Sequence, residues 1–124
     1  LAVAEKENSV IAYEDLKGQY RDIEEDAHIL NSIAQSTYLK ESEDLAELVN
    51  QTIHQRTQMP NQGFHQAGLY VLMGAAMPRI LVEAGFISNA YEEKLLRTRN
   101  FRQKIAESLL ESIRKFKEKY ERHI

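Results

Sequence analysis

Two short apolar runs constrain the fold of this chain more than any other feature of its sequence. The runs AGLYVLM (residues 67–73) and RILVEAGF (residues 79–86) are rich in side chains that favour strands and are separated by the turn-forming GAAMP. Both runs are nearly continuous rather than alternating, which is typical of strands covered on both faces. We therefore expect two buried strands of a central sheet that lies between helices. Because two strands cannot form a stable sheet alone, we expect the other strands to come from outside this chain or from a second copy.

Helical patterns lie on both sides of these runs. Apolar side chains recur at helical spacing through residues 26–58, which predicts one long helix or two helices in tandem. After the second run, Asn89 with Glu92 and Asn100 with Gln103 have the spacing of capping boxes, which predicts the starts of two further helices. The last helix has an apolar stripe that we expect to pack on the sheet. The stripe consists of Phe101, Ile105, Leu109, Ile113, Phe116 and Tyr120.

The overall composition excludes several classes of protein. The chain has 124 residues, 43% of them hydrophobic, which suits one ordinary globular domain or a piece of a larger one. Its formal net charge of -3 gives no electrostatic support for a nucleic acid partner. The absence of cysteine excludes a disulfide scaffold and thiolate metal sites. No apolar segment is long enough to span a bilayer, and the first residues lack the features of a signal peptide, so we expect the chain to begin inside a longer protein.

Glu83 is the candidate catalytic residue, because it stands in the middle of the second apolar run. An ionised carboxylate in a buried strand costs several kcal/mol unless it is paired or used by a site at the end of the strand. Ligands bind at the carboxyl ends of strands in open α/β sheets, which favours a functional role for Glu83. The alternative is a structural carboxylate that is satisfied by a neighbouring arginine or backbone amide, and the residues alone leave both possibilities open.

The other polar residues offer weaker candidates. His28, His54 and His65 have no second ligand three or four residues away, so we assign none of them to a metal site. No glycine-rich phosphate-binding fingerprint occurs, and a nucleotide cofactor is therefore not expected. Ser88 has no adjacent histidine and no nucleophile elbow, so we interpret it as a helix cap rather than a nucleophile.

A longer comparison of motifs connects the chain with a known family. The segment HQAGLYVLMGAAMPRILVEAGFISNAYEEKLL, followed by FRQKIAESLLESIRKF, closely resembles the C-terminal part of zinc-dependent N-acetylmuramoyl-L-alanine amidases of the amidase 3 type. Upstream, LAVAEKEN and ESEDLAELV are similar to two helical motifs of the same catalytic domain. The resemblance therefore covers residues 1–124 as the C-terminal portion of such a domain. It implies an α/β fold, a three-layer domain with a mostly parallel sheet between helices, here lacking its N-terminal strands.

The resemblance also implies a mechanism. In this family a histidine in a GHGG motif, a glutamate on the next helix and a histidine in a SIHAN motif hold zinc. None of these motifs occurs here, so we expect the zinc ligands upstream of Leu1 and assign no metal ligand in this chain. The motif assigns to Glu83 the role of general base and acid, which takes a proton from zinc-bound water and returns it to the leaving amine. A nearby divalent cation would make the burial of Glu83 tolerable.

The substrate that the resemblance implies is peptidoglycan, cleaved between N-acetylmuramic acid and L-alanine, which places the enzyme in the periplasm or outside the cell. Some relatives carry a segment that covers the zinc until an activator protein removes it, and residues 12–28 occupy the corresponding place here. A plain connecting helix is the alternative for these residues.

For the chain as a whole, the alternative is a non-catalytic fragment or a cell-wall-binding module without zinc ligands. The chain alone is expected to be inactive, to bind zinc poorly and to be marginally stable.

Overall fold

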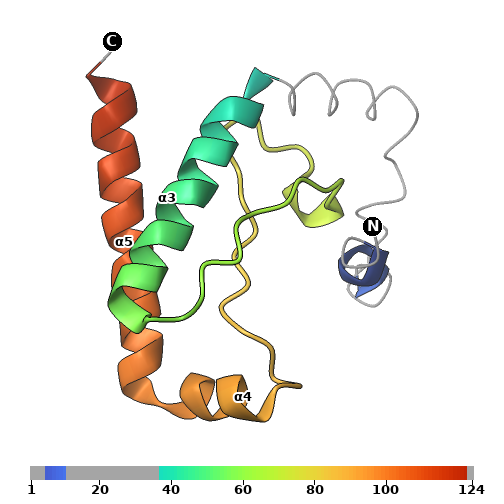
Figure 1. Cartoon of the computed structure of the whole chain (residues 1–124). Coiled ribbons are helices and arrows are strands. Elements are labelled where there is room, and N and C mark those ends of the chain that lie inside the picture. Colours follow the sequence, from blue (N-terminus) through green and yellow to red (C-terminus); the bar gives the residue numbers. More distant parts are fainter. Residues whose placement is uncertain (1–4, 11–36, 123–124) are drawn as a thin grey trace. The chain divides into compact units, whose positions relative to one another are not determined.

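The computed structural model describes residues 5–10 and 37–122 (Figure 1). Residues 5–10 are helical. The further elements are helix α3 (Leu39–Thr57), the short 3-10 helix η1 (Tyr70–Leu72), helix α4 (Ala90–Arg97) and helix α5 (Arg99–Glu121). By its internal contacts the chain divides into two compact units. The first unit comprises Leu1–Ser42 and His65–Arg79, and the second comprises Glu43–Phe64 and Ile80–Ile124.

The expected α/β fold, a three-layer domain with a mostly parallel sheet, is wrong for this structure. Residues 5–10 and 37–122 contain no β-strand. The first apolar run forms η1 instead of a strand, and residues 79–86 are extended without regular secondary structure. Val71 and Leu81, expected to be covered on both sides, are 58% and 40% exposed. A strand forms only when a neighbour supplies its hydrogen bonds, and within the described residues no segment pairs with either run, so strand propensity alone did not produce a sheet.

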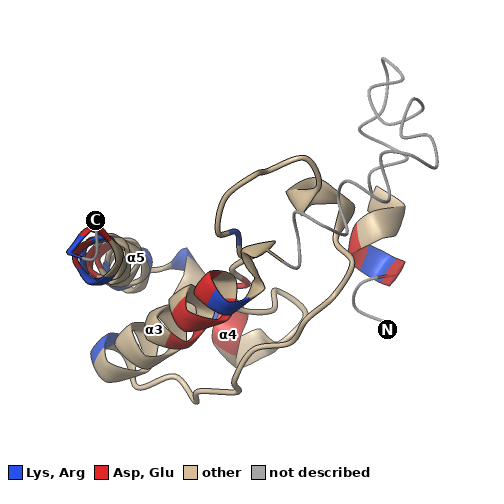
Figure 2. Ribbon diagram, turned by 90° about the horizontal axis from the view of Figure 1, so that it is seen from above, with Lys and Arg blue, Asp and Glu red and all other residues tan. Residues whose placement is uncertain are grey.

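In the second unit, α3 from Glu43 onward and α5 lie side by side (Figures 1 and 2). Near the start of α3, the Asp44 carboxylate accepts hydrogen bonds from Lys119 and Tyr120 near the end of α5, both at 2.6 Å. Near the end of α3, Arg56 forms an ion pair of 3.3 Å with Glu107 in the first half of α5. Because early residues of one helix meet late residues of the other, the two helices are antiparallel.

Small hydroxyl side chains line the contact between α3 and α5. Ser108 and Ser112 are 0% exposed, and Thr52 is 2% exposed. Each hydroxyl donates to the carbonyl four residues earlier in its own helix: Ser108 to Lys104 at 2.7 Å, Ser112 to Ser108 at 2.7 Å and Thr52 to Leu48 at 2.8 Å. These bonds satisfy the buried hydroxyls, and the small side chains let the two helix backbones approach closely.

The apolar stripe of α5 is only partly confirmed. Phe101 and Ile105 are buried, with 6% and 8% exposure, but Ile113 is 56% exposed. The reason is that α3 packs along the line of Ser108 and Ser112, which turns Ile113 toward solvent. The buried face of α5 is therefore the one that packs against helix α3. The sequence predicted instead that the apolar stripe would pack against a sheet.

The start of α4 agrees with the prediction. The side chain of Asn89 accepts hydrogen bonds from the backbone N–H groups of Tyr91 and Glu92 at 3.0 and 3.1 Å. It thus satisfies two N–H groups that have no partner within the first turn of the helix. Ser88, interpreted as a helix cap, is not the cap, because it stands one residue before Asn89.

The start of α5 differs from the prediction. Its cap is Thr98, whose hydroxyl accepts from the N–H of Phe101 at 3.3 Å, so Asn100 lies inside the helix instead of capping it. Thr98 also ends α4, where its own N–H donates to the carbonyl of Leu95 at 2.9 Å. A single residue therefore ends one helix and begins the next, which leaves no room for a separate cap at Asn100.

In the first unit, polar side chains hold irregular backbone. The side chain of Asn8 donates to the carbonyl of Gly68 at 2.8 Å and accepts from the N–H of Tyr70 at 2.9 Å. These two hydrogen bonds satisfy backbone groups that would have paired with a neighbouring strand in a sheet. The predictions for residues 12–28 lie outside the described residues. None of the helices in the described part of the chain combines the length and apolar character needed to cross a membrane.

Candidate functional site

Glu83 lies in the second unit, in the extended segment that precedes the start of α4. It is exposed, although the sequence predicted a buried position. Within the described residues, its carboxylate forms no hydrogen bond and no ion pair. Neither the arginine nor the backbone amide expected for a structural carboxylate contacts it there. Its oxygens are therefore open to solvent and to a molecule that approaches from solvent.

The turn that follows Glu83 is tied to helix α4. The carboxylate of Glu92 accepts a hydrogen bond of 2.6 Å from the N–H of Phe86. Gly85 has a φ of 155°, which only glycine adopts readily, and a Cβ at this position would meet the same Glu92 oxygen at 3.2 Å. The capping box predicted a bond from Glu92 back to the N–H of Asn89, but that N–H donates to the carbonyl of Phe86 at 3.0 Å. The spacing of Asn89 and Glu92 thus identified the two residues correctly, but the partner of the Glu92 carboxylate is the N–H of Phe86 and not that of Asn89.

A second polar contact holds the end of the first unit. The guanidinium of Arg79 donates to the carbonyls of Leu72 and Ala75 at 2.6 and 3.2 Å. The backbone N–H of Arg79 donates to the hydroxyl of Ser42 at 3.0 Å, and this hydroxyl donates to the carbonyl of Tyr38 at 2.7 Å. Arg79 therefore stabilises the irregular backbone between η1 and Pro78. No sequence motif predicted this role, because its acceptors are main-chain carbonyls.

The histidines do not form a site in the described part of the chain. Nδ1 of His54 lies 2.6 Å from the carbonyl oxygen of Met59 at the end of α3, and His65 is exposed. His28 lies outside the described residues. Within residues 5–10 and 37–122, no three side chains of histidine, cysteine, aspartate or glutamate lie close enough together to hold a metal ion. The described residues by themselves do not fit a zinc centre.

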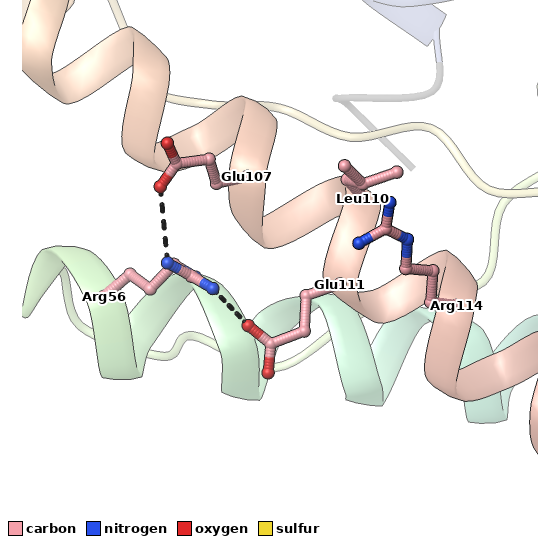
Figure 3. A pocket seen from close by; sticks show the side chains of 5 residues that line it. All are labelled: Arg56, Glu107, Leu110, Glu111 and Arg114. Atoms are coloured by element: carbon pink, nitrogen blue, oxygen red, sulfur yellow. Dashed lines mark hydrogen bonds and ion pairs between the residues drawn. The ribbon is translucent and has the colours of Figure 1, made fainter.

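A shallow pocket of about 240 Å³ lies on the surface of the α3–α5 pair (Figure 3). Its lining residues are Arg56, Glu107, Leu110, Glu111 and Arg114. Arg56 bridges Glu107 and Glu111, which are one turn apart on α5 (Figure 3). Hydrogen bonds from Lys115 and then from Arg56 lower the pKa of Glu111 below its ordinary value. Arg56, Glu107 and Glu111 pair with one another across the two helices, so this pocket is part of the contact between α3 and α5.

Comparisons with known proteins connect the chain with one family. The amidase 3 family model, described as N-acetylmuramoyl-L-alanine amidase, matches residues 8–115. The N-acetylmuramoyl-L-alanine amidase AmiC of Escherichia coli is 34% identical over 89 residues, which are 72% of this chain and 21% of AmiC. The corresponding AmiA of Escherichia coli K12 is 34% identical over 85 residues, which are 68% of this chain and 29% of AmiA. The probable cell wall amidase LytH of Staphylococcus epidermidis is 24% identical over 91 residues, which are 73% of this chain and 31% of LytH. No solved structure matches the chain significantly.

The matches cover most of this chain and a smaller part of each relative. The chain spans between 21% and 31% of the length of these three relatives. The range matched by the family model contains the motif MPRILVEAGFISN (residues 77–89) and, within it, Glu83. The resemblance seen in the sequence is thereby confirmed. The chain belongs to the amidase 3 family of N-acetylmuramoyl-L-alanine amidases and forms part of a domain of that family.

Proposed function

We propose that the protein carrying this chain is a peptidoglycan hydrolase that cleaves the amide between N-acetylmuramic acid and L-alanine. The observation that carries the proposal is the family match over residues 8–115, which includes Glu83 and the motif around it. Peptidoglycan lies outside the cytoplasmic membrane, so the protein acts in the cell envelope, in the periplasm or outside the cell. The names of its relatives, amidases and probable cell wall amidases, support this assignment.

In this proposal Glu83 is the catalytic acid and base. The Glu83 carboxylate accepts a proton from the water whose oxygen attacks the amide carbon, and a new carbon–oxygen bond forms. The carboxyl group then gives that proton to the nitrogen, the carbon–nitrogen bond breaks and L-alanine leaves with a free amine. The exposure of Glu83 and the absence of a partner for its carboxylate in the described residues support this role. A carboxylate already occupied by an arginine would be a poorer base, because the positive charge stabilises its ionised form.

We also propose that the enzyme depends on zinc, with ligands from outside the residues that the structure describes. The described residues by themselves do not fit a zinc centre. We therefore propose none of Glu83, His54 and His65 as a zinc ligand. An activator protein that displaces residues 12–28 is part of the same proposal. Its support is the acidic and weakly amphipathic sequence of this segment.

The test is the substitution Glu83→Gln in the full-length protein that contains this chain. Glutamine keeps the shape of the side chain but cannot act as a base, so the rate of muramoyl amide cleavage should fall by roughly a hundredfold to ten-thousandfold. The melting temperature should not change, because the Glu83 carboxylate has no partner within the described residues. A matched control is Glu118→Gln, since Glu118 is an exposed carboxylate and, within the described residues, pairs with Arg122 at 3.8 Å.

Two outcomes would contradict the proposal. A Glu83→Gln protein that melts earlier yet cleaves at the parental rate would make Glu83 a structural carboxylate. A parent protein that binds peptidoglycan but releases no new L-alanine amine would favour a cell-wall-binding module. Release of amine is measured directly on purified peptidoglycan, and binding is measured by sedimentation with the same material.

A further inference from the structure

We propose that Glu92 is a positioning residue for Glu83, an inference that rests on the proposed function above. Glu92 does not touch the reacting atoms in this proposal. It holds the backbone three residues beyond Glu83 through the N–H of Phe86, and so determines where the Glu83 carboxylate stands.

The need for such a residue follows from the segment that carries Glu83. Residues 79–86 are extended, but they pair with no strand in the described part of the chain. In a sheet, ladder hydrogen bonds on both sides would fix the backbone of each residue. Here the backbone on the α4 side of Glu83 is held at Phe86, where the N–H donates to Glu92 at 2.6 Å and the carbonyl accepts from the N–H of Asn89 at 3.0 Å.

The geometry of Gly85 shows that this contact is close and specific. Its φ of 155° directs the chain past the first turn of α4. A Cβ built on Gly85 would lie 3.2 Å from the Glu92 oxygen that accepts the Phe86 N–H, and 3.4 Å from the side chain of Leu96. A side chain at residue 85 would therefore require the Glu92 carboxylate to shift, and it would also be strained at this φ.

The Glu92 side chain extends from the first turn of helix α4. The N–H of Glu92 is held by the Asn89 side chain at 3.1 Å, so the residue lies in the capped first turn. A charge-assisted bond from a carboxylate to a backbone N–H is among the stronger hydrogen bonds in proteins. The backbone of Glu92 is thus held in the capped first turn of α4, and from there its carboxylate accepts the Phe86 N–H in the turn after Glu83.

The inference is tested by the kinetics of Glu92 variants of the full-length protein. Glu92→Ala removes the acceptor, and kcat should fall by roughly tenfold to a hundredfold because a misplacement of about 1 Å at a catalytic group has that effect. KM should change little, since Glu92 does not contact substrate. Glu92→Gln should restore most of the rate, because its amide oxygen can accept the same N–H. The matched control is Glu93→Ala, which removes the neighbouring carboxylate and its ion pair with Arg97 and should leave kcat unchanged.

A second variant and a direct readout separate positioning from general stability. Gly85→Ala should also lower kcat, because a Cβ at residue 85 would meet the Glu92 carboxylate at 3.2 Å and the φ of 155° strains a residue with a side chain. In protein labelled with nitrogen-15 phenylalanine, the amide resonance of Phe86 should move less in Glu92→Gln than in Glu92→Ala, because only the alanine removes the acceptor.

Each result bears on the inference. An unchanged kcat in folded Glu92→Ala protein overturns it, and so does a kcat that falls equally in the alanine and glutamine variants. A fall in melting temperature with an unchanged rate for each folded molecule shows a purely structural role and also overturns it. A parent protein without amidase activity refutes the proposed function itself and this inference with it, whereas an active parent with a Glu92-independent rate refutes the inference alone.

Discussion

The contact between α3 and α5 makes a sharp prediction for Ser108. This side chain is 0% exposed, and its hydroxyl lies 2.7 Å from the carbonyl of Lys104 and 3.5 Å from that of Thr52. The substitution Ser108→Leu replaces one back-bonded hydroxyl oxygen with three carbon atoms, a net gain of two heavy atoms between two closely packed helices. The hydroxyl matters little, because the Lys104 carbonyl keeps its position in the helix ladder. The added volume dominates the effect, since the backbone of α3 stands where the leucine would go.

We expect Ser108→Leu to lower the free energy of unfolding by about 1–3 kcal/mol, the usual cost of overpacking a filled contact. For a domain of this size, that corresponds to a fall of roughly 3–15 °C in melting temperature. Ser108→Ala is the matched control for loss of the hydroxyl, and it should cost less than about 1 kcal/mol. Ile113→Ser is the control for the apolar stripe, and it should change stability by no more than about 0.5 kcal/mol because Ile113 is 56% exposed.

The assay is thermal unfolding followed by far-ultraviolet circular dichroism, with all three variants in the same buffer. The order of the three melting temperatures tests the packing. If the apolar stripe of α5 were its buried face, Ile113→Ser would lower the melting temperature more than Ser108→Leu. If Ile113→Ser destabilises the protein more than Ser108→Leu, then α5 does not face α3 through its serines and the description of the contact is wrong.

Two further predictions follow from the ion pairs and from the sequence upstream of α3. Because Lys115 and Arg56 lower the pKa of Glu111 below its ordinary value of 4.5, the stability that this group contributes should be present above pH 4.5 and be lost as the pH falls through the lowered pKa. Melting temperatures measured across that acidic range should therefore fall more steeply for the parent than for Glu111→Gln, and equal slopes would contradict the assignment. Deletion of residues 14–24 from the full-length protein should raise its basal rate of peptidoglycan cleavage, and an unchanged or lower rate in a well-folded deletion would refute an inhibitory role for that segment.

The sequence determined those features that depend on neighbouring residues along the chain. The cap at Asn89 was predicted correctly, since a cap needs only a suitable side chain and the first turn of its own helix. The helical character of α3 and α5 was also predicted, from apolar spacing and helix-forming residues. The family was recognisable from the motif around Glu83, because a motif is a local pattern and survives without knowledge of the fold.

The tertiary structure decided which groups meet. The apolar runs 67–73 and 79–86 have strand composition, but a strand exists only with a partner, and the described residues supply none. The stripe on α5 could not show that Ser108, and not Ile113, faces α3, because the buried face of a helix is set by what packs against it. Likewise, the spacing of Asn89 and Glu92 identified a cap, but only the path of the chain at Gly85 brings the Phe86 N–H to the Glu92 carboxylate. Contacts of this kind depend on the positions of whole segments, which short-range propensities along the sequence do not determine.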